Sequence, residues 1–548
     1  MRRRLATATR AFSATSRNPS LLRAQLAFGA AWTAEWAFTV AIAVVAFRDG
    51  GPAAVGLVVF VRTAPAAVLA PFGSSLADRF RRDRVLLWSC LVRAAAIAPA
   101  AAILAAGGPT VAVYLLAVVA TAAFTMFRPV HSALLPGLCT TPLELTSANL
   151  VRGLLDSLST LVGPLAAALL LEFGSPAAVF AATAALSLGS ALLLVRLSYE
   201  PPPRPAPRPL RRIANETVEG FRALTRYRDA GLLIGLAVAQ TLTLGFLNVF
   251  LVVVALDLLA LGESGVGVLT AALGAGAVAS SLAASMFVSG HRLAALEGVG
   301  VVLWGLPLTL SGAFPHATVI VGLMCVIGVG NALVDIGLYT LPTRLVPDEM
   351  LARLFGAKES LTALSVALGS LVTPFAIALL GIRGALVVLG LVAPTLVAVA
   401  WRRLTRIDAS IERRDEEIAV LNRVPMFRPL PLPAMNSLAL HVRRGQLDAG
   451  EEVFRQGDPG DRFYVIEDGE ADVIGDGRLI RTMAAGEGFG EMALLHDRPR
   501  TTTVRARTSL RLYALDRGHF LSAVTGYQSS TREADELMRH RLATFDPA

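Results

Sequence analysis

Long apolar segments recur through the first 404 residues, and they constrain the fold more than any other feature of this sequence. A helix needs about 20 apolar residues to cross the ~30 Å hydrocarbon core of a bilayer. Twelve segments meet this requirement and are separated mostly by short Gly/Pro turns: residues 24–47, 52–77, 84–107, 110–137, 146–173, 176–196, 231–260, 264–289, 294–314, 317–345, 351–379 and 383–403. The sequence therefore predicts an all-α membrane domain of twelve transmembrane helices embedded in a lipid bilayer.

The density of charged residues changes at the end of the twelfth segment. Residues 1–404 hold 48 Lys, Arg, Asp and Glu side chains with a balance of +12, whereas the much shorter remainder, 405–548, holds 43 with a balance of −3. Soluble domains are roughly 25% charged, so we expect the first part to lie in lipid and the second in water. The overall charge of +9 belongs to the membrane part and predicts no nucleic-acid partner.

Several motifs of catalytic and metal-binding proteins are absent from the sequence. The single lysine, Lys358, follows Ala357, so the GxxxxGK[ST] phosphate loop of ATPases does not occur. The three cysteines form no CxxC pair and the seven histidines form no HExxH motif, which indicates neither a zinc site nor a disulfide framework. No nucleophile–base arrangement is visible either. We therefore expect no metal, no cofactor and no enzymatic activity.

Arginine is distributed unevenly among the predicted loops. Clusters precede the first apolar segment and follow the second, sixth and twelfth, whereas the alternate loops hold little beyond Arg48 and Arg383. Because cytoplasmic loops carry the excess of Arg and Lys, both termini are predicted to be cytoplasmic at the inner (plasma) membrane. Residues 1–23 then form a cytoplasmic N-terminal segment.

The twelve predicted helices fall into two halves, residues 24–196 and 231–404. The break between them, 197–230, contains PPPRPAPRPLRR and is predicted to be a semi-rigid cytoplasmic linker. The halves resemble each other weakly, since LLPGLCTTPLELTSAN in the first corresponds to TLPTRLVPDEMLARLFG in the second, and each has a proline within its fifth helix. Six plus six spans with internal similarity is a common plan of transporters.

Beyond residue 404 the pattern changes to that of a soluble domain. Residues 405–425 contain the charged stretch IERRDEEIAVLNRV, which predicts a connecting amphipathic helix. In 426–548, alternating segments such as RFYVIEDGEADVIGDG are punctuated by Gly or Gly-Asp, which predicts an antiparallel β-roll. The final stretch, YQSSTREADELMRHRLATF, returns to helical spacing. The predicted architecture is thus a helical membrane domain followed by a cytosolic β-roll with flanking helices.

The strongest motif in the sequence is FGEMALLHDRPRTTTV, residues 489–504. Gly490 permits a close backbone approach, and the amides after it can donate to an anion. Glu491 can accept hydrogen bonds from sugar hydroxyls. Arg500 offers a planar fork for a phosphate, with the Thr501 hydroxyl beside it. One Arg and one carboxylate suit a ligand with a single phosphate charge next to a ribose.

This stretch resembles the phosphate-binding cassette of cyclic-nucleotide-binding domains, the family of the bacterial catabolite activator protein and protein kinase A regulatory subunits. The resemblance extends over about residues 411–545. It implies that Glu491 binds the ribose 2′-hydroxyl and that Arg500 binds the cyclic phosphate. It also implies that the rest of the phosphate cradle consists of Gly490, Met492, Ala493 and Thr501.

The resemblance leaves the base open between cAMP, which we favour, and cGMP. In that family a Thr directly after the cassette Arg, here Thr501, can favour guanine but also occurs in proteins that bind cAMP. The family closes the pocket with a C-terminal helix, here about 529–543, so the candidates for capping the base are Arg539, Arg541 and Leu542. For each of them, a solvated or protein-facing position is the alternative.

A second resemblance lies between the second and third predicted helices. The stretch LADRFRRDR, residues 76–84, is similar to the signature loop of the major facilitator superfamily, which Asp78, Arg79 and Arg82 fit. This implies a loop that locks one conformation; a plain positive-inside anchor is the alternative. LSTLVGPLAAALL resembles a Gly-Pro motif of exporters in that superfamily, and the layout is most similar to its macrolide and siderophore efflux branch.

Charged side chains inside the predicted spans are costly in lipid and are usually functional or paired. The candidates for transport or coupling are Glu35, Arg62, Arg93, Arg128 and Asp156. Glu35, between two tryptophans, is the first candidate for a proton-coupling group. The alternative is a structural Glu–Arg pair, for example with Arg62.

These features together predict a proton-coupled secondary transporter that exports a small amphiphilic molecule. A cyclic nucleotide, cAMP or cGMP, would regulate it from the cytosolic domain. One alternative is a membrane-anchored cyclic-nucleotide receptor whose transporter-like domain does not move solute. In another, the nucleotide domain tethers or traffics the protein and leaves transport unaffected.

Overall fold

The computed structural model describes residues 18–139, 142–195, 197, 210–287, 292–430, 432–526 and 528–545. The chain separates into two compact units, Met1–Thr405 and Arg406–Ala548. This boundary lies at the same point as the change in charge density. The apolar, poorly charged part of the sequence and the charged part therefore fold as different units.

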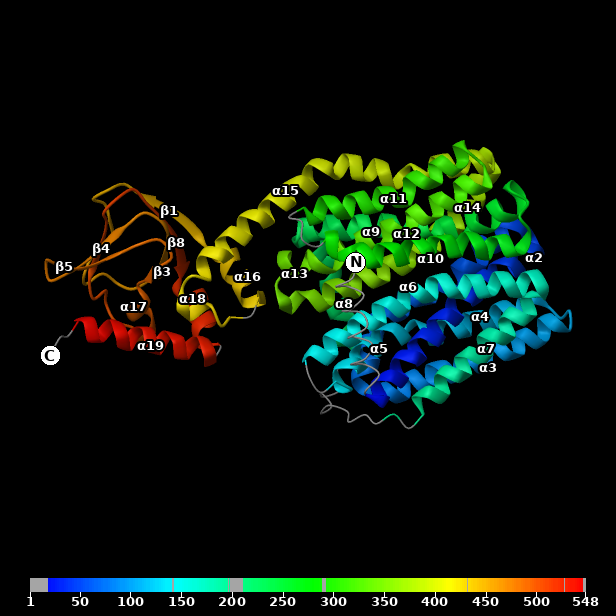
Figure 1. Cartoon of the computed structure of the whole chain (residues 1–548), viewed down its shortest axis with the longest axis horizontal. Helices are drawn as coiled ribbons and strands as arrows, with labels where there is room; N and C mark the ends of the chain where they lie inside the picture. Colours follow the sequence, from blue (N-terminus) through cyan, green and yellow to red (C-terminus); the bar gives the residue numbers. More distant parts are fainter. Residues whose placement is uncertain are drawn as a thin grey trace. The chain divides into compact units, whose positions relative to one another are not determined.

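The first unit consists of helices, which Figure 1 shows as two bundles coloured from blue to cyan and from green to yellow. The helices of the first half are α2 (Pro19–Arg79), α3 (Arg82–Ala105), α4 (Thr110–Thr125), α5 (Phe127–Leu134), the 3₁₀ turn η1 (Leu135–Gly137), α6 (Pro142–Phe173) and α7 (Pro176–Leu194). Those that follow are α8 (Leu210–Arg226), α9 (Arg228–Val253), the π-helical turn η2 (Val254–Leu258), α10 (Gly262–Phe287), α11 (Leu293–Ala313), α12 (Ala317–Thr340), α13 (Pro342–Leu345), α14 (Asp348–Gly390) and α15 (Val392–Leu421).

Ten helical stretches among the described residues are long and apolar enough to cross a membrane. Two of them are interrupted. The helix α2 is broken at Gly50 and Gly51, and α14 is broken at Gly381, where the backbone leaves helical φ/ψ values. Each of these long elements therefore consists of two helices that meet at glycine.

The segment between the halves differs from the predicted linker. Half of it, Leu210–Arg226, is helix α8, which packs on α14. A Cβ at Gly220 would lie 2.2 Å from the carbonyl oxygen of Arg353, and Glu219 pairs with Arg353 at 2.7 Å. Charged and polar side chains make this segment polar on average. One face of α8 is nevertheless buried, and Ala223 lies on it. The prediction from composition did not anticipate this helix, because it took no account of helical spacing.

Two other predicted segments have different helix ends in the structure. The signature loop at 76–84 is a two-residue turn, because Asp78 and Arg79 belong to the last turn of α2 and Arg82 opens α3. No separate connecting helix begins at 405, because α15 continues from the apolar segment through Leu421. After Pro394, no Gly or Pro interrupts this stretch, so a helix can continue although its surroundings change.

The two halves of the first unit approach each other closely at several glycines, two of which lie against the proline of a fifth helix. A Cβ at Gly56 of α2 would lie 2.7 Å from the Pro374 ring in α14, and a Cβ at Gly267 of α10 would lie 2.6 Å from the Pro164 carbonyl oxygen in α6. In membranes, small residues permit this backbone-to-backbone packing. The prolines predicted within each fifth helix therefore both lie against a glycine of the opposite half.

The second unit is built from two four-stranded antiparallel sheets with strand orders β1-β8-β3-β6 and β2-β7-β4-β5. The strands are β1 (Arg443–Leu447), β2 (Glu452–Phe454), β3 (Arg462–Asp468), β4 (Ala471–Gly475), β5 (Arg478–Met483), β6 (Gly488–Phe489), β7 (Thr503–Ala506) and β8 (Leu510–Asp516). The helices that accompany them are η3 (Pro425–Phe427), α16 (Leu432–His441), α17 (Glu491–His496), α18 (Arg517–Thr525) and α19 (Gln528–Phe545).

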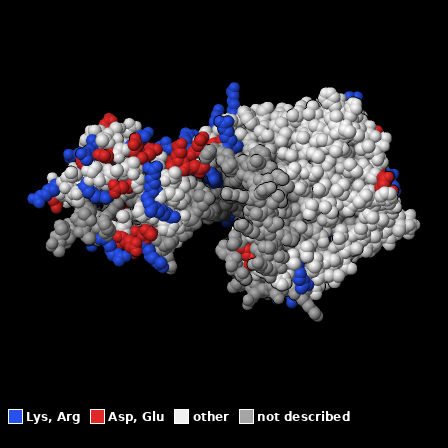
Figure 2. All heavy atoms as spheres, in the orientation of Figure 1, with Lys and Arg blue, Asp and Glu red and all other residues white. Residues whose placement is uncertain are grey.

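Strand β3 separates two hydrophobic cores of this unit. Successive side chains of a strand point to opposite faces, so Phe463 and Val465 join a core formed with the helices, while Tyr464 and Ile466 join the core between the two sheets. The predicted β-roll with flanking helices is confirmed in this unit. Figure 2 shows the corresponding surfaces, with charged side chains scattered over this unit and few on the visible face of the membrane unit.

Candidate functional site

The predicted phosphate cradle forms one pocket in the second unit. All six of its residues line a cavity of about 50 Å³: Gly490, Glu491, Met492, Ala493, Arg500 and Thr501. The cavity lies where β6 passes into α17 and where the chain returns toward β7. Residues that are ten positions apart along the chain are thus placed together, as the cassette motif predicts.

Gly490 occupies a backbone conformation that a side chain would strain. Its φ is +93°, and an added Cβ would lie 2.6 Å from Nη1 of Arg500 and 3.1 Å from the carbonyl oxygen of Arg462. Only glycine adopts this region without steric cost. The residue therefore permits both the tight turn into α17 and the close approach of the Arg500 guanidinium.

Arg500 is almost completely buried and is held rigidly. Its Nη1 donates to the carbonyl oxygen of Gly490 at 3.0 Å, and its Nη2 donates to that of Arg462 at 2.7 Å. The guanidinium lies over the Phe454 ring, 4.1 Å from its centroid. Its side chain is 1% exposed, and the carboxylate of Asp461, itself 63% exposed, is 3.4 Å away. The guanidinium is thus held in place, and the exposed Asp461 compensates little of its charge. Such a preorganised guanidinium suits the binding of an anion.

Electrostatics lead to the same conclusion. Burial lowers the pKa of Arg500 below its ordinary value, and the nearby Tyr464 and Asp461 oppose this effect. Its Nε is buried and has no hydrogen-bond partner among the described residues. A buried cation is unfavourable unless an opposite charge balances it. A phosphate in this pocket would supply that charge.

Sequence reasoning missed one charged residue of this pocket. Arg481 of β5 lines it and pairs with Glu487 at 2.9 Å. The other lining residues outside the predicted cradle are Phe454, Val473, Met483, Phe489, Thr502 and Val504. Arg481 lies in another strand and belongs to no recognisable spacing with the cassette, so only the fold connects the two.

Of the three predicted base-capping residues, the structure describes the side chain of Arg539 alone, and Arg539 does not line the pocket. No residue of α19 that the structure describes lines it. Arg539 is exposed, and its Nε lies 3.4 Å from the carbonyl oxygen of Asp535 in the same helix; the side chains of Arg541 and Leu542 lie outside the described residues. Helix α19 packs instead on η3, where buried Ser530 donates to the carbonyl oxygen of Met426.

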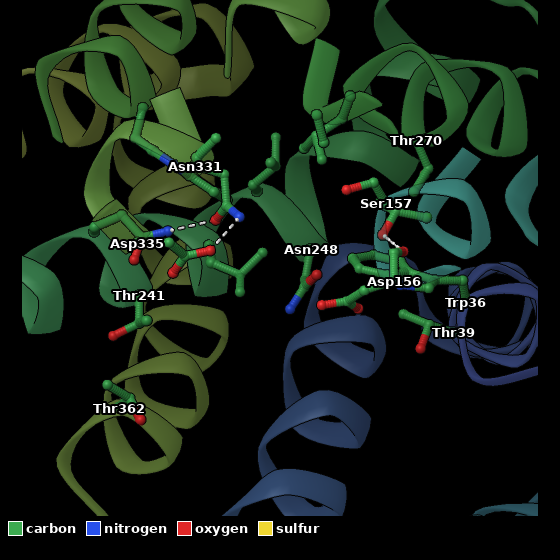
Figure 3. A pocket seen from close by; sticks show the side chains of 18 of the residues that line it. Trp36, Thr39, Asp156, Ser157, Thr241, Asn248, Thr270, Asn331, Asp335 and Thr362 are labelled. Atoms are coloured by element: carbon green, nitrogen blue, oxygen red, sulfur yellow. Dashed lines mark hydrogen bonds between the residues drawn. The ribbon is translucent and has the colours of Figure 1, made fainter. Parts of the chain in front are cut away.

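A larger cavity of about 390 Å³ lies in the membrane unit and is lined by both halves (Figure 3). Of the predicted transport residues, Arg128 and Asp156 line it, and they form an ion pair of 2.7 Å. Trp32 and Trp36 line it as well. About half of the lining residues are polar or charged and the others are apolar or aromatic, so the cavity offers both apolar contacts and polar groups to a small molecule.

The other three predicted transport residues form a separate buried cluster. Glu35 pairs with Arg93 at 2.8 Å and with Arg62 at 3.7 Å, and none of the three lines the cavity. Arg93 also lies over Phe124, 4.1 Å from the ring centroid. The arrangement matches the structural alternative for Glu35, although the nearer partner is Arg93 rather than the expected Arg62.

The predicted gate residues are only partly described. The side chains of Asp78 and Arg79 lie outside the described residues. Arg82, at the start of α3, donates from Nη1 to the carbonyl oxygen of Ala133 in α5 at 2.7 Å. This contact ties the end of one helix to another in the same half.

Several polar residues of the large cavity lie in the second half, where the sequence analysis selected no candidates. Asp335 accepts from Asn331 at 3.3 Å, and Asn331 accepts from Gln240 at 3.4 Å. Lys358 pairs with Glu359 at 2.8 Å. Asp335 was visible in the sequence as an acid within a span, but only the fold shows that it faces the cavity. No group of three potential metal ligands occurs among the described residues.

Two families account for most of the chain. Residues 25–357 match the Major Facilitator Superfamily, and residues 444–527 match the cyclic nucleotide-binding domain. Since the first match covers more than half of the sequence, the chain belongs to the Major Facilitator Superfamily. It is a multi-pass membrane protein of this superfamily that carries a C-terminal cyclic nucleotide-binding domain, and both domains are non-catalytic.

Individual relatives match the second unit. The cAMP-dependent protein kinase regulatory subunit of Emericella nidulans is 32% identical over 148 residues, which is 27% of this chain and 36% of that protein. The subunit of Schizosaccharomyces pombe is 37% identical over 122 residues, or 22% of this chain and 29% of that protein. The chain therefore spans about a third of the length of these relatives. The regulatory domain of Toxoplasma gondii PKA, solved with cAMP, is 25% identical over 24% of this chain and 52% of that chain, with a TM-score of 0.22.

Proposed function

We propose that the protein is a secondary active transporter, a proton-coupled exporter of a small amphiphilic molecule, which a cyclic nucleotide regulates. The observation that carries the transport proposal is the 390 Å³ cavity, because residues of both halves line it. A site at the interface of two repeats is the usual position for substrate in transporters of this plan. The similarity of LSTLVGPLAAALL to a Gly-Pro motif of exporters supports export, and that of RTAPAAVLAPFGSSLADR and SANLVRGLLDSLSTLVGP supports assignment to the macrolide and siderophore efflux branch.

The lengths of the helices support twelve spans. Of the ten apolar stretches, Pro19–Ala67 has 49 residues and Met350–Leu421 has 72. At about 1.5 Å per residue, either would extend far beyond the ~30 Å hydrocarbon core. If each contributes two spans across its glycine break, the total becomes twelve. Both termini then lie on one side, which the arginine distribution assigns to the cytoplasm, at the inner (plasma) membrane.

The nucleotide proposal rests on Arg500. Its buried fork lies in the same pocket as the Glu491 carboxylate, so one pocket offers a phosphate partner and a hydrogen-bond acceptor for a ribose. The relatives named as cAMP-dependent favour cAMP. Arg481 favours cGMP instead, because guanine presents N7 and O6 acceptors to an arginine fork. The nucleotide can gate transport only if it binds two transporter states with different affinity.

Transport in proteoliposomes tests the proposal. The purified full chain is reconstituted with a trapped pH-sensitive dye, amphiphilic compounds are added, and proton flux is recorded with and without cAMP or cGMP. We expect substrate-dependent proton flux that changes with nucleotide, and a variant Arg500→Ala whose flux no longer responds. Nucleotide binding without any flux would favour the receptor alternative. Flux indifferent to both nucleotides would favour a tethering role for the second unit.

A further inference from the structure

The large cavity of the membrane unit carries a surplus of one negative charge. Its ionised lining residues are Arg128, Asp156, Asp335, Lys358 and Glu359. Arg128 pairs with Asp156 at 2.7 Å, and Lys358 pairs with Glu359 at 2.8 Å. Each pair is neutral as a whole. Asp335 is the remaining lining charge.

Asp335 lacks a cationic partner within the described part of the chain. No Lys, Arg or His nitrogen there lies within 4.0 Å of its carboxylate, and its hydrogen-bond partner is the uncharged amide of Asn331 at 3.3 Å. A carboxylate within a membrane span is unfavourable unless a counter-charge accompanies it. Arg128 and Lys358 act on this carboxylate without forming an ion pair with it, so the site can accommodate a further positive charge in direct contact.

The surroundings of Asp335 indicate what would carry this charge. Asn331, Asp335 and Tyr339 follow one another at four-residue spacing, so α12 presents them on one face to the cavity. Figure 3 shows Asn331 and Asp335 on one side of the cavity, and Trp36 on the other. Aromatic walls attract organic cations through their π faces. A volume of about 390 Å³ is in the range of pockets for drug-sized molecules.

We propose that Asp335 binds the charged group of a monovalent organic cation with an aromatic or apolar body, and that such cations are the substrate class. This inference rests on the proposed transport function and names its substrate. Glu35 is unsuited to this role because two arginines already neutralise it outside the cavity. A proton competes with the cation for Asp335. The charged groups that act on Asp335 are Arg128 and Asp156 from the first half and Lys358 and Glu359 from the second. Tyr339, on the same helix as Asp335, also lines the cavity.

Binding to the detergent-purified full chain tests the assignment. The probes are radiolabelled tetraphenylphosphonium and tetraphenylborate, which share size and apolar surface but carry opposite charge. We expect binding of the cation, weaker binding of the anion, and cation affinity that rises with pH. Asp335→Asn should weaken cation binding at least tenfold and abolish its pH dependence. The matched control is Asp257→Asn, because Asp257 is an exposed acid of the same half outside the cavity lining.

Three results would overturn the assignment: an Asp335→Asn variant that binds the cation like the parent chain, a preference for tetraphenylborate, or failure of the parent chain to bind the cation. Failure of the transport proposal would look different. A chain that binds tetraphenylphosphonium through Asp335 but drives no proton flux would refute transport and retain the cation site. Nucleotide binding to the same samples verifies that Asp335→Asn and Asp257→Asn preparations are equally folded in their second unit.

Discussion

Replacing Arg500 by lysine keeps the positive charge that would bind a phosphate but removes the planar, forked shape of the guanidinium. The guanidinium makes two main-chain bonds at once, to the carbonyl oxygens of Gly490 and Arg462, and keeps Nε for a ligand. Lysine has one nitrogen with three donors and cannot reproduce this fork. A hydrogen bond that involves a charged group contributes about 1.5–3 kcal/mol. We therefore expect Arg500→Lys to weaken cyclic-nucleotide binding by about 10–100-fold.

The same substitution should lower stability. One of the two carbonyl acceptors loses its donor, and an unsatisfied buried acceptor costs about 1–3 kcal/mol. For a unit of this size, each kcal/mol corresponds to a shift of about 4 °C in Tm. Calorimetric titration of the full chain with cAMP and cGMP measures the affinity, and thermal unfolding measures the stability. Arg498→Lys is the matched control, since Arg498 is exposed and lies outside the pocket.

Two results would refute this reasoning. Unchanged nucleotide affinity in Arg500→Lys would mean that charge alone suffices and that the fork geometry is irrelevant. An equal loss in Arg498→Lys would mean that the effect comes from the loop as a whole. A loss of affinity at unchanged stability would retain the phosphate contact but would contradict the structural role of the two main-chain bonds.

Three further substitutions test other parts of the structure. Glu35→Gln leaves the buried Arg93 without its carboxylate partner, and breaking a buried ion pair costs about 3–5 kcal/mol. We therefore expect a lower unfolding temperature of the variant in detergent. Unchanged stability together with lost proton flux would instead restore Glu35 as a proton-coupling group. Arg481→Leu should weaken cGMP binding about tenfold more than cAMP binding, and equal losses in calorimetry would exclude Arg481 from base recognition. Burial and the stacked ring of His441, with centroids 3.8 Å apart, lower the pKa of His519. Below the ordinary histidine pKa of about 6.5, the folded state then binds fewer protons than the unfolded state. The free energy of unfolding should therefore decrease as pH falls through about 6.5. Hydrogen exchange should show a smaller loss of stability over this pH range in His519→Gln.

The sequence was sufficient to predict the features that depend only on residues close together along the chain. Gly490, Glu491 and Arg500 lie within a short stretch, and the steric demand at φ +93° and the need for a planar fork are both visible in the residue types. The apolar segments were equally visible because lipid imposes the same length on every span. Helix α8 was missed because its apolar face is diluted by charged neighbours in the average composition.

The sequence could not predict which distant side chains meet. Glu35 was expected near Arg62, but Arg93 is closer, because the pairing depends on how α3 packs against α2. Asp335 was recognisable as an acid inside a span, and nothing in its neighbours distinguished it from Asp156. The difference is that Asp156 has a cationic partner from another helix and Asp335 has none among the described residues.

The contacts of Gly56 with Pro374 and of Gly267 with Pro164 have a mechanical consequence. One contact involves a rigid proline ring and the other a main-chain carbonyl oxygen, so rotation about a line through the two contacts requires no rotamer to change there. The pair can act as a fulcrum: the halves separate at one end of the unit as they close at the other, while the cavity lined by both halves stays in place. A larger side chain at either glycine would block this rotation and hold the two halves in a single conformation.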